Sequence, residues 1–243
     1  MERNGLPDAA AGADAKGAGD YVTATDRASE AAIVDVLREA TPDIALLAEE
    51  GGGTRAGTMW AVDPLDGTTN FVHAYPQVGV SVGLIEQGRP AIGVVIAPFM
   101  DIEFAGGEGL GITRNGTRIR TSGARQPASA VVATGFPFKR KDRLPRYLPM
   151  LHGALTSFED LRRVGSAALD LAFVAAGVFD GFFELSLSTW DVAAGAALVL
   201  EAGGVVTDWD GGDTWLESGD ILAGPPAVHA ELVRLARSSR GDA

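Results

Sequence analysis

The sequence predicts an α+β fold in which strands and helices are gathered into separate layers. Apolar residues alternate in the manner of strands through residues 78–119, with turns in place of helices between the strands. Helix-like spacing of apolar residues occurs in the segments on either side. Such runs of strands and of helices are typical of layered α+β architectures and not of strict βαβ alternation. With 243 residues, 46% of them hydrophobic and 21% charged, the chain can bury a sizeable core.

In the N-terminal half, residues 1–19 are rich in Ala, Gly and Asp and lack periodicity, which predicts a flexible leader. Residues 20–243 then form a single domain. A helix is expected over residues 26–40, because apolar residues recur there at helical spacing and a Thr-Pro-Asp turn ends the pattern. The strands expected in this half lie at residues 44–48, 59–62, 78–104 (with a turn at 86–90) and 112–119.

In the C-terminal half, a strand at 131–134 precedes a basic loop at 139–146, whose charge we expect to be solvated, and a helix up to residue 156. Ser188-Thr189-Trp190-Asp191 resembles a capping box that opens a helix, which the glycine pair at 203–204 ends. The remaining expected elements are a helix at 165–177, strands at 178–187 and 205–207, a turn at 208–213 and a helix at 227–237.

The composition limits the classes of partner. A formal net charge of −12 argues against nucleic acid or an anionic membrane as the main partner. An acidic protein that handles phosphate needs a local positive potential, and bound divalent cations supply it most simply. The lack of cysteine excludes disulfides, zinc thiolates and thiol nucleophiles. No apolar stretch reaches membrane-spanning length and no signal-peptide pattern is present, so we expect a cytoplasmic location.

The most informative segment follows the strand at 59–62 and reads Asp63-Pro64-Leu65-Asp66-Gly67-Thr68-Thr69-Asn70. Its proline fixes φ, and its glycine permits a positive φ and a close approach of a ligand to the main chain. A short helix can begin after the glycine, and its first N–H groups favour an anion. The two carboxylates and the leucine carbonyl between them offer oxygen ligands to cations. An Asx-type turn is the alternative, but it needs only one Asp and one Gly. The segment therefore predicts metal ions held against a phosphate.

Acidic residues recur where a strand or helix meets a loop. They are Asp26, Glu49, Asp63, Asp66 and Asp191. Such positions can converge on one cleft, and a helix N-terminus favours the ionised form of a carboxylate. A cluster of acids without His or Cys suits Mg²⁺ or Mn²⁺ and not zinc. Taken singly, each acid can also be a helix N-cap or a solvated end, and Asp191 in particular fits the capping box.

Four segments, in this order, resemble the signatures of the inositol monophosphatase family. They are Asp20-Tyr21-Val22-Thr23-Ala24-Thr25-Asp26, Ala48-Glu49-Glu50, the central segment extended to Phe71, and Trp190-Asp191-Val192-Ala193-Ala194-Gly195. The resemblance runs from about Lys16 to about Ala223. It implies the layered αβαβα sandwich of the sugar phosphatases and a Mg²⁺-dependent phosphomonoesterase activity with two to three metal ions, for which Mn²⁺ can substitute. It also implies inhibition by Li⁺, a small sugar or polyol phosphate as substrate and usually a homodimer.

The resemblance also implies the ligands of the metal ions. Glu49, Asp63 and the Leu65 carbonyl would hold the first ion. Asp63, Asp66 and Asp191 would hold the second, and Glu49 would also serve a weaker third site.

The catalytic groups are implied in the same way. Asp26 and Thr68 would form a hydrogen-bonded pair that, with Glu49, orients and deprotonates a metal-bound water for in-line attack on phosphorus. The N–H groups of Gly67 and Thr68 would hold the phosphate. No covalent phosphoenzyme is required.

Substrate contacts are implied further along the chain. Glu184 would accept hydrogen bonds from ring hydroxyls, and Gly165-Ser166-Ala167 would line the same pocket with Asp66. The alternative for Glu184 is an exposed acid on a strand. Lys16 resembles the lysine of the family's mobile loop over the site. Family members usually carry a long helix before that loop, and its absence here suggests a shortened variant, a late start codon or a trimmed end.

Rival functions remain open at this stage. The same hydrolysis can act on inositol 1-phosphate, histidinol phosphate, fructose 1,6-bisphosphate or a nucleotide 3′-phosphate, although Thr69-Asn70 disfavours the nucleotide branch. A catalytically silent relative is a rival from another class. Two other motifs fail on context: Gly79-Val80-Ser81-Val82-Gly83 alternates like a strand and not like a nucleophile elbow, and the glycines at 51–53 precede a strand and not a helix. The histidines show no metal-ligand spacing.

Overall fold

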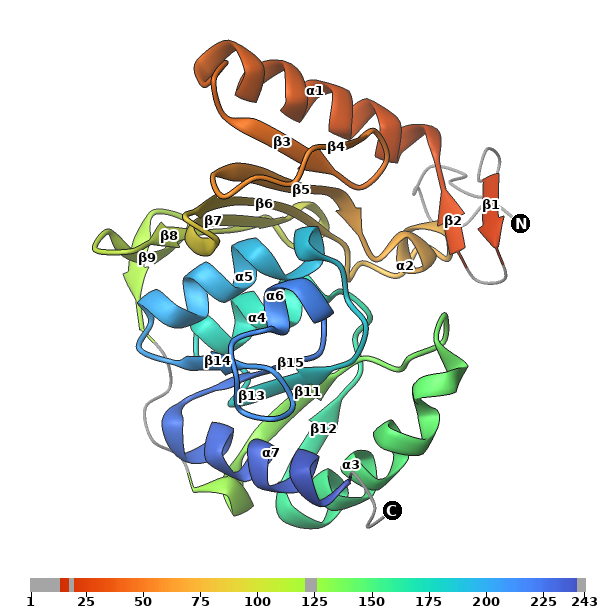
Figure 1. Cartoon of the computed structure of the whole chain (residues 1–243), viewed down its shortest axis with the longest axis vertical. Coiled ribbons are helices and arrows are strands. Elements are labelled where there is room, and N and C mark those ends of the chain that lie inside the picture. Colours follow the sequence, from red (N-terminus) through yellow and green to blue (C-terminus); the bar gives the residue numbers. More distant parts are fainter. Residues whose placement is uncertain (1–13, 18–19, 121–125, 240–243) are drawn as a thin grey trace.

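The protein forms alternating layers of helices and sheets (Figure 1). The structure is a computed structural model and describes residues 14–17, 20–120 and 126–239. Helix α1 (Ala24–Ala40) covers an eight-stranded sheet, α4 (Ala167–Ala175) and α5 (Thr189–Glu201) fill the middle, and a five-stranded sheet is covered by α3 (Leu144–Ser157) and α7 (Pro226–Ser238). This order confirms the predicted α+β fold and its αβαβα sandwich.

The larger sheet is mainly antiparallel. Its strand order is β10 (Thr117–Ile119), β9 (Gly111–Arg114), β8 (Ile102–Gly107), β7 (Arg89–Ala97), β6 (Gly79–Glu86), β5 (Met59–Asp66), β3 (Ala45–Ala48) and β4 (Gly52–Gly53). Only the β3–β5 pair is parallel among the described strands of this sheet. Because β3 and β5 run in the same direction, Glu49 and the end of β5 meet at one edge of the sheet.

The smaller sheet is mixed. Its order is β12 (Asp160–Arg162), β11 (Val131–Thr134), β13 (Gly181–Glu184), β15 (Ile221–Gly224) and β14 (Val205–Thr207). β12, β11 and β13 run parallel, so the loops that follow them leave from the same edge. The short elements are α2 (Thr68–Val72), α6 (Trp215–Ser218), the paired strands β1 (Asp14–Gly17) and β2 (Asp20–Val22), and the 3₁₀ turns Pro98–Met100, Pro127–Ser129 and Lys141–Arg143.

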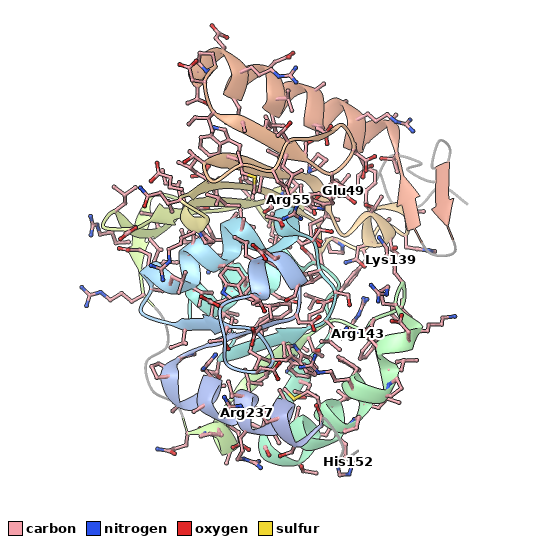
Figure 2. All side chains as sticks on the ribbon, viewed as in Figure 1. Glu49, Arg55, Lys139, Arg143, His152 and Arg237 are labelled. Atoms are coloured by element: carbon pink, nitrogen blue, oxygen red, sulfur yellow. The ribbon has the colours of Figure 1, made fainter. Side chains whose placement is uncertain are left out.

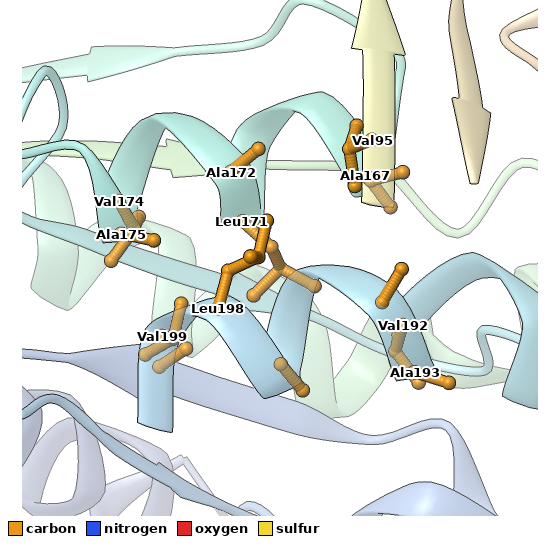
Figure 3. Packing of buried hydrophobic residues seen from close by; sticks show 14 of the residues in the cluster. Val95, Ala167, Leu171, Ala172, Val174, Ala175, Val192, Ala193, Leu198 and Val199 are labelled. Carbon is orange, nitrogen blue, oxygen red and sulfur yellow. The ribbon is translucent and has the colours of Figure 1, made fainter. Parts of the chain in front are cut away.

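The main core lies between the two sheets, where α4 and α5 are buried on nearly every side. All residues of α4 and most of α5 are buried, as expected for helices with a sheet on each face. Small residues allow the close approach: a Cβ atom at Gly195 would lie 2.5 Å from Leu171 Cβ. Figure 3 shows Leu171 of α4 beside Leu198 of α5 in this packing.

Several predicted boundaries were wrong for local physical reasons. The helix at 165–177 begins only at Ala167, because Ser166 is its N-cap. The strand at 112–119 is a hairpin, since Asn115 and Gly116 both have positive φ. The strand at 178–187 is limited to Gly181–Glu184. Several short elements, namely β1, β2, β4, β12, β15 and α6, were not predicted.

Other expectations fall partly outside the described residues. Residues 1–13 of the expected leader are not described, and 14–17 pair with β2. The side chain of Lys16 is likewise not described, so its expected position over the site stays a prediction. No helix in the described parts of the chain is long and apolar enough to cross a membrane.

Candidate active site

The central turn lies where β5 leaves the larger sheet. The pairing of β5 with β6 shifts register between Asp63 and Asp66. Gly67 has a φ of +94° and precedes α2. A Cβ atom at Gly67 would lie 2.9 Å from the Gln77 carbonyl oxygen, so space and backbone conformation both require glycine here. The positive φ predicted for Gly67 is therefore confirmed.

Asp26 and Thr68 meet at the junction of α1 and the turn. Asp26 is buried, and its Oδ2 accepts a hydrogen bond from the Thr23 backbone N–H at 2.8 Å in the capping box of α1. Thr68 Oγ1 lies 3.3 Å from Asp26 Oδ1 and 3.3 Å from the Leu65 carbonyl oxygen. Helix α1 thus brings Asp26 to the same place as the turn.

Carboxylates from separate elements lie close enough to repel one another. They are Glu49, Asp63, Asp66 and Asp191. Desolvation raises the pKa of Asp63 well above its usual value and that of Asp191 to about 8, and repulsion by Asp66 and Glu49 adds to both shifts. Negative charge is therefore concentrated in a poorly solvated place, which favours a bound cation.

The donor set of this cluster consists of oxygen atoms. Among residues 14–17, 20–120 and 126–239, no three His, Cys, Asp or Glu side chains already stand as a ready metal-ligating group. The repelling carboxylates and the nearby Leu65 carbonyl nevertheless have the chemistry that Mg²⁺ and Mn²⁺ prefer. A divalent cation would neutralise their repulsion, so the residues present fit this kind of ion.

Asp66 is anchored to the start of α4. Its Oδ2 accepts hydrogen bonds from Ser166 Oγ and from the Ala168 backbone N–H, both at 2.7 Å. Desolvation raises the pKa of Asp66 to about 6, while these two hydrogen bonds oppose the shift. The predicted substrate segment Gly165-Ser166-Ala167 therefore lies against one of the predicted metal ligands.

Glu184 ends β13 and lies within electrostatic reach of the same acids. Desolvation, followed by repulsion from Asp66 and Asp191, raises its pKa to about 8, and Arg163 opposes the shift. A Cβ atom at Gly135 would lie 2.0 Å from Glu184 Oε1, so the chain after β11 packs directly on this carboxylate. Glu184 is half-buried, which speaks against the alternative of a simple exposed acid.

Two basic residues at the site were missed from the sequence. Lys139 opposes the rise in the pKa of Asp66 and Asp191, and Figure 2 shows it on the side of the molecule where α2 lies. Lys139 is exposed, as expected for the basic loop, but its charge also acts on the acidic cluster. Arg163 lowers the pKa of Glu184. The sequence could not reveal these two residues because their placement depends on strand pairing. Lys139 follows β11, and Arg163 follows β12, an adjacent parallel strand that was not predicted.

Comparison with known proteins agrees with this arrangement. A sequence profile of the inositol monophosphatase family matches residues 3–240. The "Nus factor SuhB" of Salmonella typhimurium strain LT2 is 44% identical over 234 residues, which cover 95% of this chain and 88% of the relative. The protein of the same name from Pseudomonas aeruginosa is 47% identical over 216 residues, which cover 86% and 80%.

Solved structures share the fold. The extragenic suppressor protein suhB from Bartonella henselae superposes with a TM-score of 0.88 at 39% identity, covering 95% of this chain and 89% of that one. The inositol monophosphatase from Anabaena (Nostoc) superposes with a TM-score of 0.83 at 40% identity, covering 89% and 87%. The profile match, the relatives and these structures together show that this chain belongs to the inositol monophosphatase family.

Proposed function

We propose that the protein is a Mg²⁺-dependent phosphomonoesterase that hydrolyses inositol 1-phosphate or a related sugar phosphate with a metal-activated water. The observation that carries the proposal is the meeting of Glu49, Asp63, Asp66 and Asp191 in one poorly solvated place. Such a cluster is costly to a folded protein unless cations enter it. Membership of a generally Mg²⁺-dependent family supports the same conclusion.

The proposed metal ligands follow from this cluster. Glu49, Asp63 and the Leu65 carbonyl would hold one ion, and Asp63, Asp66 and Asp191 a second, with Glu49 also serving a third. Bound Mg²⁺ would act as a Lewis acid, lower the pKa of water and stabilise the charge that develops on the phosphate oxygens.

The proposed catalytic groups surround the Thr68 hydroxyl. Thr68 Oγ1 donates toward Asp26 Oδ1 at 3.3 Å, which leaves a lone pair of this oxygen to orient a nucleophilic water. Glu49 would accept the proton of that water. The backbone N–H groups of Gly67 and Thr68 would hold the phosphate, because the first N–H groups of a helix have no partner within it. Buried Asp26 fixes the position of Thr68.

The proposed substrate pocket adjoins Asp66 on the side away from Thr68. Glu184 would accept hydrogen bonds from the hydroxyls of the alcohol, and Gly165-Ser166-Ala167 would line the pocket. Lys16 would close over it. We further propose that residues 20–243 act as one domain and that the enzyme is a cytoplasmic homodimer. The solved structure of a Staphylococcus aureus relative with bound inositol monophosphate supports the substrate class.

A phosphate-release assay tests the proposal. Purified protein is given inositol 1-phosphate, histidinol phosphate, fructose 1,6-bisphosphate and a nucleoside 3′-phosphate, with Mg²⁺ or with EDTA. We expect Mg²⁺-dependent release that is fastest from inositol 1-phosphate or another sugar phosphate and is inhibited by Li⁺. Preference for histidinol phosphate or the nucleotide would overturn the proposed substrate, and no release from any ester would establish the catalytically silent alternative.

A matched pair of variants assigns the activity to the acidic cluster. Asp191→Asn keeps the shape of the side chain and can still accept the hydrogen bond of the Ser188 N–H. We expect it to abolish turnover in a folded protein. Asp35→Asn, on the exposed face of α1, removes the same charge and should leave the rate unchanged. Equal rates in the two variants would contradict the proposal.

A second function is favoured by the names of the relatives. Proteins 43–44% identical over 95% of this chain are called Nus factors, a name that indicates a role in transcription. We propose that this chain can also join a transcription complex by binding a protein. In such a complex it would lie near nucleic acid, although the sequence predicts that nucleic acid is not its partner. Copurification with RNA polymerase is the test, and Asp191→Asn should leave it intact if the two functions are separate.

A further inference from the structure

Arg163 stands at the edge of the proposed substrate pocket. It follows β12 and precedes Val164 and Gly165, whose carbonyl oxygens accept hydrogen bonds from Asn70 Nδ2 at 2.8 and 3.3 Å. Asn70 belongs to α2, directly after the central turn. The segment that carries Arg163 is therefore fastened to the turn that would hold the scissile phosphate.

The guanidinium group lies over Gly165. A Cβ atom at Gly165 would lie 2.5 Å from Arg163 Nη1. A Cβ atom at Gly67, in the central turn, would lie 3.2 Å from the Gly165 carbonyl oxygen. One residue, Gly165, therefore separates the guanidinium from the central turn. An alcohol no larger than a sugar ring could reach from one to the other.

Two phenyl rings also contact the guanidinium. Arg163 Cζ lies 5.6 Å from the centroid of Phe136 and 5.5 Å from that of Phe138, within the range of cation–π contacts. The rings pack edge to face at 5.7 Å, and Phe136 also packs on the buried Tyr147. Phe136 and Phe138 are both exposed, so the guanidinium that they contact stays open to solvent. The rings fix the position of the charge without neutralising it.

The donors of Arg163 remain available. Its neighbours in the basic region are paired with acids: Arg140 with Asp142, Arg143 and Arg146 with Asp220, and Arg162 with Asp160. Arg163, by contrast, makes no hydrogen bond or ion pair with any other described residue. An exposed, planar cation held by two rings is suited to bidentate recognition of a phosphate or carboxylate.

We propose that Arg163, held against Phe136 and Phe138, binds a second anionic group on the alcohol side of the substrate. The proposal rests on the proposed phosphatase function and adds to its substrate class phosphomonoesters whose alcohol carries another phosphate or a carboxylate. Glu184 lies nearby and would repel such a group, and Arg163 offsets that repulsion. Arg163 is then a specificity residue, whereas the acidic cluster performs the hydrolysis.

The test compares substrates that differ in this second charge. kcat and KM are measured with Mg²⁺ for inositol 1-phosphate, fructose 1,6-bisphosphate and 3-phosphoglycerate, in the wild type, Arg163→Gln and Arg163→Lys. Arg163→Gln should lower kcat/KM for at least one doubly anionic ester about tenfold, through KM, and change inositol 1-phosphate less than about twofold. Arg163→Lys should restore part of the loss. Arg162→Gln, which removes the neighbouring charge, should affect no substrate selectively.

Four results would overturn the proposal. One is an equal loss for all substrates in Arg163→Gln, which would indicate a structural or subunit-contact role. Another is no loss for either doubly anionic ester, or no turnover of them by an enzyme that hydrolyses inositol 1-phosphate; these leave the proposed phosphatase function standing. The last is no phosphate release from any ester, under which the phosphatase proposal fails as well.

Discussion

The side-chain amide of Asn70 donates a hydrogen bond to the Val164 carbonyl oxygen at 2.8 Å, across 94 positions of the chain. The same nitrogen lies 2.7 Å from the Gln77 carbonyl oxygen. One buried side chain therefore joins the central turn of the larger sheet to the loop that leads into α4. The two walls of the candidate site depend on this contact for their relative position.

Replacing this amide should weaken both the fold and the site. Asn70→Ala leaves part-buried carbonyl oxygens without a donor, which costs about 1–3 kcal/mol in the free energy of unfolding. KM for the best substrate should rise, because the turn and the Val164 loop are no longer held together. Urea unfolding and steady-state kinetics measure the two effects.

Asn115→Ala is the matched control. Asn115 also makes two hydrogen bonds, to the Glu103 N–H at 2.7 Å and the Asp101 carbonyl at 2.8 Å, but it is exposed on a hairpin far along the same sheet. Water can replace its bonds, so KM should not change. A rise in KM with Asn115→Ala but not with Asn70→Ala would refute the role of Asn70.

Removing one carboxylate from the acidic cluster should raise the stability of the metal-free protein and reduce its stabilisation by Mg²⁺. Asp63 is buried among acids that repel it, so Asp63→Asn should unfold at a higher temperature than the wild type in EDTA. Millimolar Mg²⁺ should stabilise the wild type by about 1–3 kcal/mol, if its concentration exceeds the Kd by ten- to a hundred-fold, and Asp63→Asn far less. Differential scanning calorimetry with and without Mg²⁺ decides it; equal Mg²⁺ shifts in both proteins would exclude Asp63 as a ligand.

The sequence was sufficient for the architecture, because helices and strands depend on local patterns, and the family resemblance indicated which acids lie together. The capping box of Ser188 and Asp191 is present as expected, with the Ser188 N–H 2.6 Å from Asp191 Oδ2. The strand at 79–83 also runs straight through its nucleophile-like motif. These features need only neighbouring residues.

What could not be predicted depends on pairing between distant segments. β12 is three residues long and has no alternation to detect, yet its parallel pairing with β11 brings Arg163 beside Phe136 and Phe138. Glu184 was predicted from the resemblance, but its contact with Gly135 follows from the register of β11 and β13. The roles of the site residues stay predictions until activity is measured.

A buried histidine should make the fold sensitive to mild acid. His229 lies in α7 with Nε2 2.9 Å from Thr207 Oγ1, and burial lowers its pKa from an ordinary 6.5 to about 4. Between these values the unfolded chain binds a proton that the folded chain does not, so stability falls as the pH drops from about 6.5 to about 4. The loss from this group amounts to roughly 2–3 kcal/mol.

The variant His229→Gln should remove this part of the pH dependence. Urea unfolding is compared at neutral pH and near pH 5, for this variant and for His152→Gln. His152 is exposed on α3 (Figure 2), so its replacement should leave the wild-type pH profile unchanged. If His229→Gln follows the wild-type profile as closely as His152→Gln does, the acid sensitivity has another origin.

The contact between β7 and α5 should tolerate little added volume. A Cβ atom at Gly93 would lie 2.1 Å from the carbonyl oxygen of Ala194 and 2.8 Å from its carbonyl carbon. Both are backbone atoms, so no side-chain rotation can relieve the clash, and α5 would have to move away from the larger sheet. Asp191 begins that helix, so the displacement would also separate it from Asp63 and Asp66. Gly93→Ala should therefore lower the free energy of unfolding by about 1–3 kcal/mol or more and lower kcat in the protein that remains folded.

Gly57→Ala is the control, because a Cβ there meets nothing within 4 Å. Urea unfolding and phosphate release measured on both variants test the argument, which fails if Gly93→Ala is as stable and as active as Gly57→Ala.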